Sequence, residues 1–389
     1  MSIYYGEDAS NRVRSPLRGT IAIARAQSPP ATISVKETHS LPTKTYKVQT
    51  QSQTGAAATL RLQKSISLEM ATYDERLSYQ RAMDFLTANE PERRLDIHLS
   101  YESFRYLEEK ARALYADAKY PRVEYSTIDS RVIIHTIPTA LHSASAAGLN
   151  DCIRDSVRDI LRRHDKRNLG NRIMPVGEST YSSVDEQGVR STRTPDAGLM
   201  YDDGQRMTLL LIVEAGVSEG YEQLKGDIEL WLKKFQCQIG ILLWLKETPR
   251  FRFPAGEVGN PGSATERALF ENAMWQVRRS RPFGPYRFNG HAWFGTLDTA
   301  LIEVFKTDVR TNEISSEQYV VVEDGTVTVQ GNGLDIGMIM ADMLPFDEEL
   351  SADEKAEPIC LATDTLLPMI ESAAHRTAIN RHNDFLTTH

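Results

Sequence analysis

The sequence has few cysteines, no long apolar run and no excess of basic residues. Its three cysteines, Cys152, Cys237 and Cys360, lie far apart in a chain of 389 residues, so neither a disulfide framework nor a cysteine-based zinc site is predicted. No apolar run approaches the ~18 residues of a membrane span, and the N-terminus lacks the apolar core of a signal peptide. We therefore expect a cytoplasmic or nuclear protein without a membrane partner.

Basic residues are too few for the molecule as a whole to attract nucleic acid. The chain has 45 Lys and Arg against 53 Asp and Glu, a formal net charge of −8, which argues against binding through the total electrostatic field. A local basic groove stays compatible with this balance. With 41% apolar and 25% charged residues, the chain can bury a real core. Its length suits two average domains or one elaborated α/β domain with tails.

Composition and periodicity divide the chain into four regions. Residues 1–57 are rich in Ser, Thr, Pro, Gln and Ala and bury too little apolar surface to order themselves, which predicts a disordered arm. Residues 58–120 show helical spacing of apolar residues, with Ser100 as a predicted cap, and form a helical extension. Residues 121–345 form the predicted core. Residues 346–389 carry many acids and are predicted to be a solvated appendage that includes a helix.

The core alternates helical and strand patterns, which predicts a mixed α/β fold. Residues 122–138 predict a β-hairpin, and residues 140–164 a long helix. Residues 172–184 are interpreted as one strand. Residues 194–245 follow as strand, turn, strand, helix and strand. After a loop, a helix is expected over residues 265–279, followed by at least three more strands, with a hairpin turn at Asp324-Gly325, and a short packing segment.

The stretch from Thr194 to Leu245 holds the predicted site. It opens on Asp196, and its most apolar run ends on Glu214; a buried carboxylate is costly unless something pairs with it. An antiparallel turn centred on Gln205 would set residues 196 and 214 opposite each other, with Cβ atoms ~5 Å apart. The two carboxylates could then share one Mg²⁺ or Mn²⁺ ion. The alternative is an exposed Asp in a turn and a strand-end Glu that pairs with an arginine.

The helix expected after Glu214 adds a lysine to this pair. Ser218 is a suitable N-cap, and Lys225 falls inside the apolar stripe of the helix, four residues after Tyr221. A lysine on a buried face requires a carboxylate, and Glu214 lies just before this helix. The alternative is that Lys225 extends its amine to the helix edge, where water solvates it.

The order helix, strand, Pro-Asp strand, apolar strand ending in Glu, helix, strand resembles the PD-(D/E)XK superfamily of restriction-endonuclease-like proteins. Within it, residues 95–345 resemble the Uma-type endonuclease family and its fungal relatives. Two short motifs carry this likeness, Val213-Glu214-Ala215-Gly216 and Asp227-Ile228-Glu229-Leu230-Trp231-Leu232. The resemblance implies a restriction-endonuclease-like mixed-sheet core, metal ligands at Asp196 and Glu214, and a lysine that activates water. The superfamily's lysine is replaced here by Gly216, which leaves Lys225 as the candidate.

These observations predict a magnesium-dependent nuclease that hydrolyses phosphodiester bonds in nucleic acid, with Asp196, Glu214 and Lys225 as its catalytic residues. Basic segments from Arg162 to Arg172 and from Arg278 to Arg281 would guide the backbone. The alternatives are a catalytically degenerate nuclease-fold protein that acts as a binding or scaffolding module, and an interaction protein. The oligomeric state stays open, a homo-oligomer included. Two further residues are weaker site candidates, His142 and Glu178.

Overall fold

The computed structural model describes residues 73–88, 94–115, 121–136, 138–176, 180–184, 188–217, 220–254, 264–308, 311–344 and 349–388. The predicted arm over residues 1–57 lies outside the described residues, as do Ser218 and Glu178. Structural statements below concern the described ranges only.

The largest sheet has seven strands in the order β14-β13-β12-β9-β8-β7-β4. They are β4 (Ile173–Val176), β7 (Ala197–Asp202), β8 (Met207–Gly216), β9 (Ile239–Thr248), β12 (Thr296–Thr307), β13 (Ile314–Glu323) and β14 (Thr326–Val327). β8 and β9 run parallel, whereas the other neighbours are antiparallel. The predicted mixed α/β class is confirmed. The predicted hairpin turn at Asp324-Gly325 is also confirmed, because both residues have positive φ.

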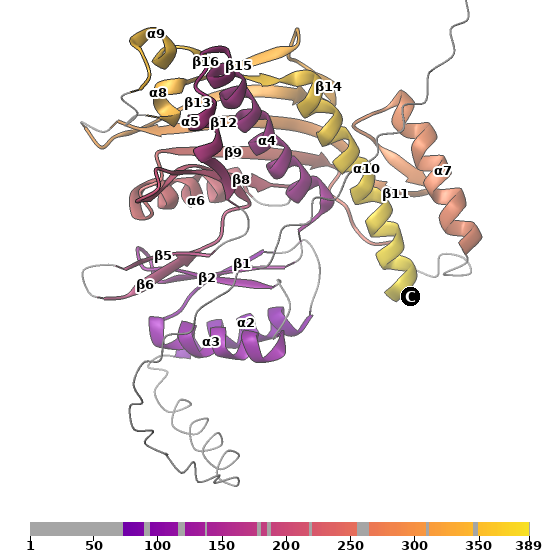
Figure 1. Ribbon diagram of the computed structural model, residues 1–389. Helices are drawn as coiled ribbons and strands as arrows, with labels where there is room; N and C mark the ends of the chain where they lie inside the picture. The colour runs from indigo at the N-terminus through magenta and orange to yellow at the C-terminus, as the bar shows by residue number, and fades with distance from the viewer. Residues whose placement is uncertain are drawn as a thin grey trace, which may run out of the picture. The chain divides into compact units, whose positions relative to one another are not determined.

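Helices cover both faces of this sheet. Figure 1 shows α4 (Ala140–Arg163) beside α10 (Thr363–Thr388) on one side and α6 (Tyr221–Lys234) on the other. In β8, Leu211 and Val213 pack into the core cluster that contains α4 and α10, whereas Ile212 packs against α6. A strand buried on both faces is apolar at successive positions. This burial explains the continuous apolar run that precedes Glu214.

A second, five-stranded antiparallel sheet has the order β1-β3-β2-β6-β5. Its strands are β1 (Arg94–His98), β2 (Arg122–Ser126), β3 (Arg131–His135), β5 (Tyr181–Val184) and β6 (Arg190–Arg193), and its helices are α2 (Tyr73–Ala88) and α3 (Tyr101–Leu114). The predicted hairpin over residues 122–138 is confirmed as β2 and β3. The predicted boundary at residue 120 is crossed by this sheet, since β1 pairs with β3. The single strand predicted over residues 172–184 is wrong, because β4 and β5 belong to different sheets.

The remaining elements complete the core. They are α5 (Arg167–Arg172), α7 (Ala264–Ser280), β10 (Tyr286–Phe288), β11 (His291–Phe294), β15 (Gly333–Ile339), α8 (Met340–Met343), α9 (Ala352–Lys355) and β16 (Pro358–Ala362). α7 confirms the helix expected over residues 265–279. The predicted packing segment is β15 with α8, and β15 pairs with β16. None of the described helices is long and apolar enough to cross a membrane.

The C-terminal helix α10 differs from the solvated appendage that the sequence predicts. Leu366, Ile370 and Phe385 are buried in the core beside α4. Leu141 in the first turn of α4 donates its backbone N–H to the Thr377 hydroxyl at 2.8 Å. The first backbone N–H groups of a helix have no partner within the helix itself. By accepting one of them, α10 caps the start of α4 as well as packing on it.

Candidate functional site

The hairpin of β7 and β8 places Asp196 and Glu214 as the sequence predicts. The ladder begins with Ala197 paired to Val213, so the next step outward sets residue 196 opposite residue 214. The turn is one residue tighter than predicted, since Asp203 donates its N–H to the Arg206 carbonyl.

A β-bulge between Leu199 and Met200 restores the register, because a bulge sets two residues of one strand against one of its partner. As far as the pair Ala197 and Val213, the ladder therefore has the predicted register, whereas Asp196 itself precedes β7 and is not part of the ladder. The predicted turn centre is wrong.

The Asp196 carboxylate is held ionised by three neighbours. Its Oδ2 atom accepts the Ala215 backbone N–H at 2.9 Å and lies 2.9 Å from Nε2 of His142, while Oδ1 lies 3.8 Å from Nη1 of Arg122. Burial raises the pKa of Asp196, but His142, the Ala215 N–H and Arg122 together outweigh it and hold the pKa far below its usual range. His142, in the first turn of α4, is thus brought to the site.

The Glu214 carboxyl is in the opposite electrostatic situation. It lies on the α6 face of the sheet, where Trp231 donates its indole N–H to Oε1 at 2.5 Å. Burial raises the pKa of Glu214 well above its usual value, and the negative charge of Asp196 raises it further. Two adjacent carboxyl groups with pKa values shifted in opposite directions are the arrangement in which one group accepts a proton while its neighbour stays charged.

This raised pKa predicts how Glu214 affects stability. Below pH 4.5, the ordinary pKa of the group, the carboxyl is protonated in both the folded and unfolded chains. Above it, the unfolded chain ionises Glu214 while the folded chain resists, so the free energy of unfolding falls by up to about 1.4 kcal/mol per pH unit. Relative to wild type, Glu214→Gln should become more stable as pH rises above 4.5, the ordinary pKa of the group, in urea titrations without divalent ions.

The matched control for this titration is Glu222→Gln, which removes an exposed carboxylate from α6, the helix that follows β8. Its stability difference from wild type should stay constant across the pH range. A constant difference for Glu214→Gln as well would contradict the raised pKa.

The structure does not bring Lys225 to Glu214. Lys225 is half-buried on α6, and within the described ranges no hydrogen bond or ion pair joins it to that carboxylate, whose indole partner is Trp231. The superfamily position for lysine is also filled: a Cβ at Gly216 would overlap the Leu224 side chain in the first turn of α6. A lysine at residue 216 would therefore require Leu224 to move.

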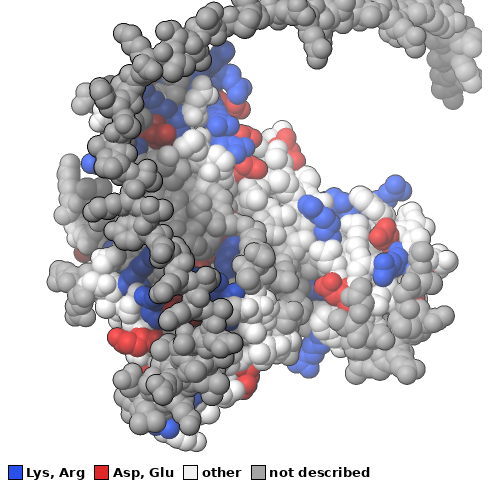
Figure 2. All heavy atoms as spheres, turned by 60° about the horizontal axis from the view of Figure 1, so that its bottom comes forward, with Lys and Arg blue, Asp and Glu red and all other residues white. Residues whose placement is uncertain are grey.

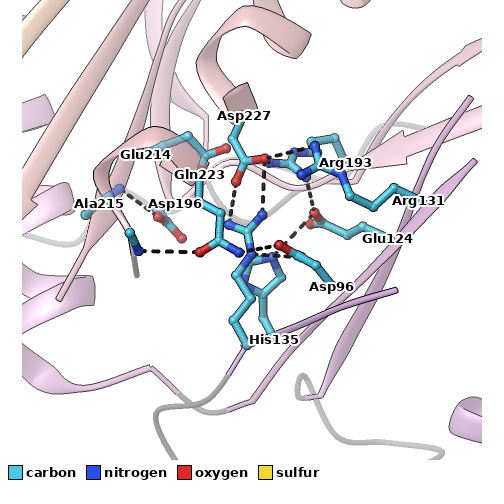
Figure 3. Close-up of polar contacts among 12 residues, drawn as sticks. Asp96, Glu124, Arg131, His135, Arg193, Asp196, Glu214, Ala215, Gln223 and Asp227 are labelled. Atoms are coloured by element: carbon cyan, nitrogen blue, oxygen red, sulfur yellow. Dashed lines mark hydrogen bonds and ion pairs between the residues drawn. The ribbon is translucent and has the colours of Figure 1, made fainter. Parts of the chain in front are cut away.

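Arginines from the smaller sheet surround a third acid, Asp227 of α6. Arg94 Nη1 lies 2.5 Å from Oδ2, Arg193 Nη2 lies 2.6 Å from Oδ1, and Arg131 is 3.9 Å away. Figure 3 shows Arg193 facing both Asp227 and Glu124. Burial raises the pKa of Asp227, but Arg193 and Arg94 outweigh this and hold it at about 2. Asp227 therefore joins α6 to the smaller sheet through charge.

Asp227 and Trp231 show what the second motif does in this chain. The two residues are one helical turn apart; Asp227 contacts the arginines while Trp231 contacts Glu214. Both residues belong to the second motif of the resemblance, but the sequence predicts a role for neither of them. A signal was present, because an acid between Leu224 and Ile228 of an apolar stripe requires a cation, just as Lys225 requires an acid.

Several arginines of the two basic segments predicted to guide nucleic acid pair with acids within the chain. Arg162 pairs with Asp159 at 2.9 Å, and Arg163 pairs with Glu357. Arg278 pairs with Glu371 at 2.7 Å. Exposed pairs of this kind leave less net charge for an external phosphate.

The acidic pair can hold a metal ion only as a two-carboxylate site. Across the described residues, no three His, Cys, Asp or Glu side chains converge as metal ligands. Asp196 and Glu214 supply oxygen ligands alone, which suits a hard ion such as Mg²⁺ that keeps several waters. The chain matches no protein-family model, no curated protein and no solved structure.

Proposed function

We propose that the protein is a metal-dependent phosphodiesterase acting on nucleic acid. The carrying observation is that Asp196, directly before β7, accepts the backbone N–H of Ala215, the residue after Glu214 in β8, at 2.9 Å. The pKa values of these two neighbouring acids are shifted apart. Buried carboxyl groups are costly, and nothing in the packing of the sheet requires two of them side by side. With α5 and the smaller-sheet strands β5 and β6 set aside, the order α4, β4, β7, β8, α6, β9 supports the restriction-endonuclease-like core that the resemblance implies.

Asp196 and Glu214 would hold the Mg²⁺ or Mn²⁺ ion of this proposal. Among the described residues, the hydrogen bond from Trp231 is the one that the Glu214 side chain accepts, and it uses Oε1. Oε2 is left for a cation, which would favour the ionised form that burial opposes. When bound, the ion would lower the pKa of an attacking water and neutralise charge on the phosphodiester.

The chain's own residues would orient this chemistry. His142 and the Ala215 N–H fix the Asp196 carboxylate from two directions, and Trp231 fixes Glu214. His142 is a positioning residue in this arrangement, since its contact is with Asp196.

One observation favours a second candidate, a nuclease-fold protein that binds nucleic acid without cleaving it. Leu224 occupies the space that a side chain at Gly216 would need, and Lys225 makes no contact with Glu214. A site without a lysine beside its carboxylates lacks the group that the resemblance assigns to water activation. The phosphate-binding surface could be kept while cleavage is lost.

A nicking assay decides between the two candidates. Purified protein is incubated with supercoiled plasmid, or with a labelled single strand, in Mg²⁺, Mn²⁺ or EDTA. The phosphodiesterase proposal expects metal-dependent cleavage that falls at least tenfold in Asp196→Ala, because loss of a positioned charge in a catalytic site costs about 10²–10³ in rate. Glu222→Ala, an exposed acid on α6, is the control and should cleave as wild type does.

Each outcome of the assay has one meaning. Equal cleavage by wild type and Asp196→Ala would overturn the site assignment. Absence of cleavage, combined with Mg²⁺-dependent stabilisation that Glu214→Gln removes, would favour the binding module. Absence of both cleavage and metal-dependent stabilisation would overturn the metal site itself.

A further inference from the structure

A polar pocket of about 580 Å³ opens beside the candidate site. It lies between α3 and the strands β2 and β6, and its lining includes four arginines, Arg105, Arg112, Arg122 and Arg190. Its volume is within the range of pockets that hold small ligands. None of the sequence-based expectations concerned it, because the arginines are spread over 85 residues of sequence between Arg105 and Arg190.

The charge of this pocket is positive in a molecule that is acidic overall. Two acids also line it, Glu108 and Glu124. Glu124 is already bound by Arg193 at 3.2 Å and by the Thr194 N–H at 3.0 Å. Glu108 faces Arg112.

Two of the arginines keep their charge available. Arg105 and Arg190 are exposed, and neither forms an ion pair within the part of the chain that the structure describes. On the face shown in Figure 2, Lys and Arg side chains lie among Asp and Glu. The pocket thus concentrates positive charge locally, which is the condition for anion binding by an acidic protein.

Arg122 links the pocket to the acidic pair. It lines the pocket, and its Nη1 atom lies 3.8 Å from Asp196 Oδ1 and 3.5 Å from the Thr194 carbonyl. An anion held by the pocket arginines would therefore lie next to the carboxylate that the proposed function assigns to the metal. Because Arg122 belongs to both the pocket and the surroundings of Asp196, a ligand bound in the pocket changes the electrostatic potential at the acidic pair.

We propose that this pocket binds a phosphate-bearing nucleotide of a single nucleic-acid strand and seats it beside the Asp196–Glu214 pair. An arginine guanidinium can donate two parallel hydrogen bonds to two oxygens of one phosphate, which orients the phosphate as well as balancing its charge. Tyr101 adds a half-buried aromatic ring to the same lining, and bases stack on such rings without sequence preference. A pocket that seats one unstacked nucleotide favours a single strand over a duplex. The ligand's identity rests on the proposed function, whereas anion binding does not.

Binding is tested without cleavage. Wild type and the double variant Arg105→Gln/Arg190→Gln are titrated into a fluorescently labelled single strand of about ten nucleotides in EDTA, with anisotropy as the readout. The double variant should bind at least tenfold more weakly. The slope of log K against log salt should also fall by about 1.4, since each neutralised phosphate contributes about 0.7 for a single strand.

The control is Arg76→Gln/Arg81→Gln, which removes the same charge from exposed positions of α2 outside the pocket lining. It should bind as wild type does. A mononucleotide competitor separates a free nucleotide from a strand, and should compete at much higher concentrations than an unlabelled strand. The proposed binding site would be overturned if Arg105→Gln/Arg190→Gln bound the strand with unchanged affinity. It would also be overturned if both double variants lost the same amount of affinity. Binding of the mononucleotide but not of the strand would overturn it too.

Failure of this inference and failure of the proposed function are distinguishable. If the pocket variant loses strand binding and wild type does not cleave, the pocket proposal stands and the phosphodiesterase proposal is wrong. Metal-dependent cleavage that needs Asp196 but ignores Arg105 and Arg190 keeps the phosphodiesterase and removes the pocket.

Discussion

Asp227→Ala should lower the free energy of unfolding by about 3–5 kcal/mol, one of the two largest effects expected for a single substitution in this chain. Its carboxylate is 2% exposed and lies within 2.6 Å of the Arg94 and Arg193 guanidinium groups. The substitution removes one of the acids that face these arginines, while Arg94 keeps Asp96 at 3.0 Å and Arg193 keeps Glu124 at 3.2 Å. The buried cluster is left with one negative charge too few, and buried positive charge that is not balanced cannot recover the solvation it has lost. Urea unfolding followed by tryptophan fluorescence measures the difference.

The matched control is Glu229→Ala, two residues further along α6. Its carboxylate is 38% exposed and pairs with Lys233 at 2.8 Å, an i,i+4 surface pair worth only about 0.3–0.5 kcal/mol. Asp227→Asn tests the role of charge, because it keeps the shape and one acceptor oxygen while removing the ionised carboxylate. If Asp227→Ala costs no more than the control, the arginine cluster does not join α6 to the smaller sheet through charge.

The parts of the fold that the sequence predicts well are those whose signal is local. The apolar run before Glu214 indicates a strand buried on both faces, and the stripe from Tyr221 indicates the helix that packs on it. The register that opposes residues 196 and 214 was also predictable, although the argument relied on a turn that is one residue too long. The bulge at Leu199 and Met200 restored the register, and nothing in the sequence marks that bulge.

The parts that the sequence does not predict depend on contacts between distant segments. Arg94, Arg131 and Arg193 meet Asp227 from three different strands, and β1, which carries Arg94, is a strand of only five residues. The sequence favours Lys225, on the next helix, as the partner of Glu214. The partner in the structure is the indole N–H of Trp231, which is an uncharged donor. A buried acid predicts that a partner exists, and the fold decides which residue it is.

The C-terminal helix α10 is another element whose burial depends on contacts between distant segments, and here the buried residues include polar ones. Thr377, Arg381 and His382 are buried although their residue types are typical of a surface. Arg381 is 4% exposed and reaches Glu247 of β9 at 2.9 Å, while the His382 ring stacks on Phe270. These polar residues and the acids that precede the helix are what made it look solvated.

Glu247→Ala should therefore destabilise the protein by about 3–5 kcal/mol, even though it lies more than 130 residues from Arg381 in the sequence. The substitution leaves the Arg381 guanidinium buried without its carboxylate and removes the acceptor of the Gly295 N–H, which lies 2.6 Å from Oε1. Hydrogen exchange should rise along α10 together with the loss of stability, because the helix is held to β9 through this pair. Glu323→Ala, an exposed acid on β13, is the control and should change the free energy of unfolding by less than about 0.5 kcal/mol.

A second substitution separates the buried charge from simple loss of contacts. Arg381→Met in the Glu247→Ala background removes the buried guanidinium charge while keeping an apolar chain of similar length. Replacing both members of a buried ion pair is often far less costly than removing one, so the double variant should be more stable than Glu247→Ala alone. If Glu247→Ala unfolds with the same urea midpoint as wild type, or if Arg381→Met adds its full cost to it, the pair does not hold α10 in the core and the helix is attached by its apolar face alone.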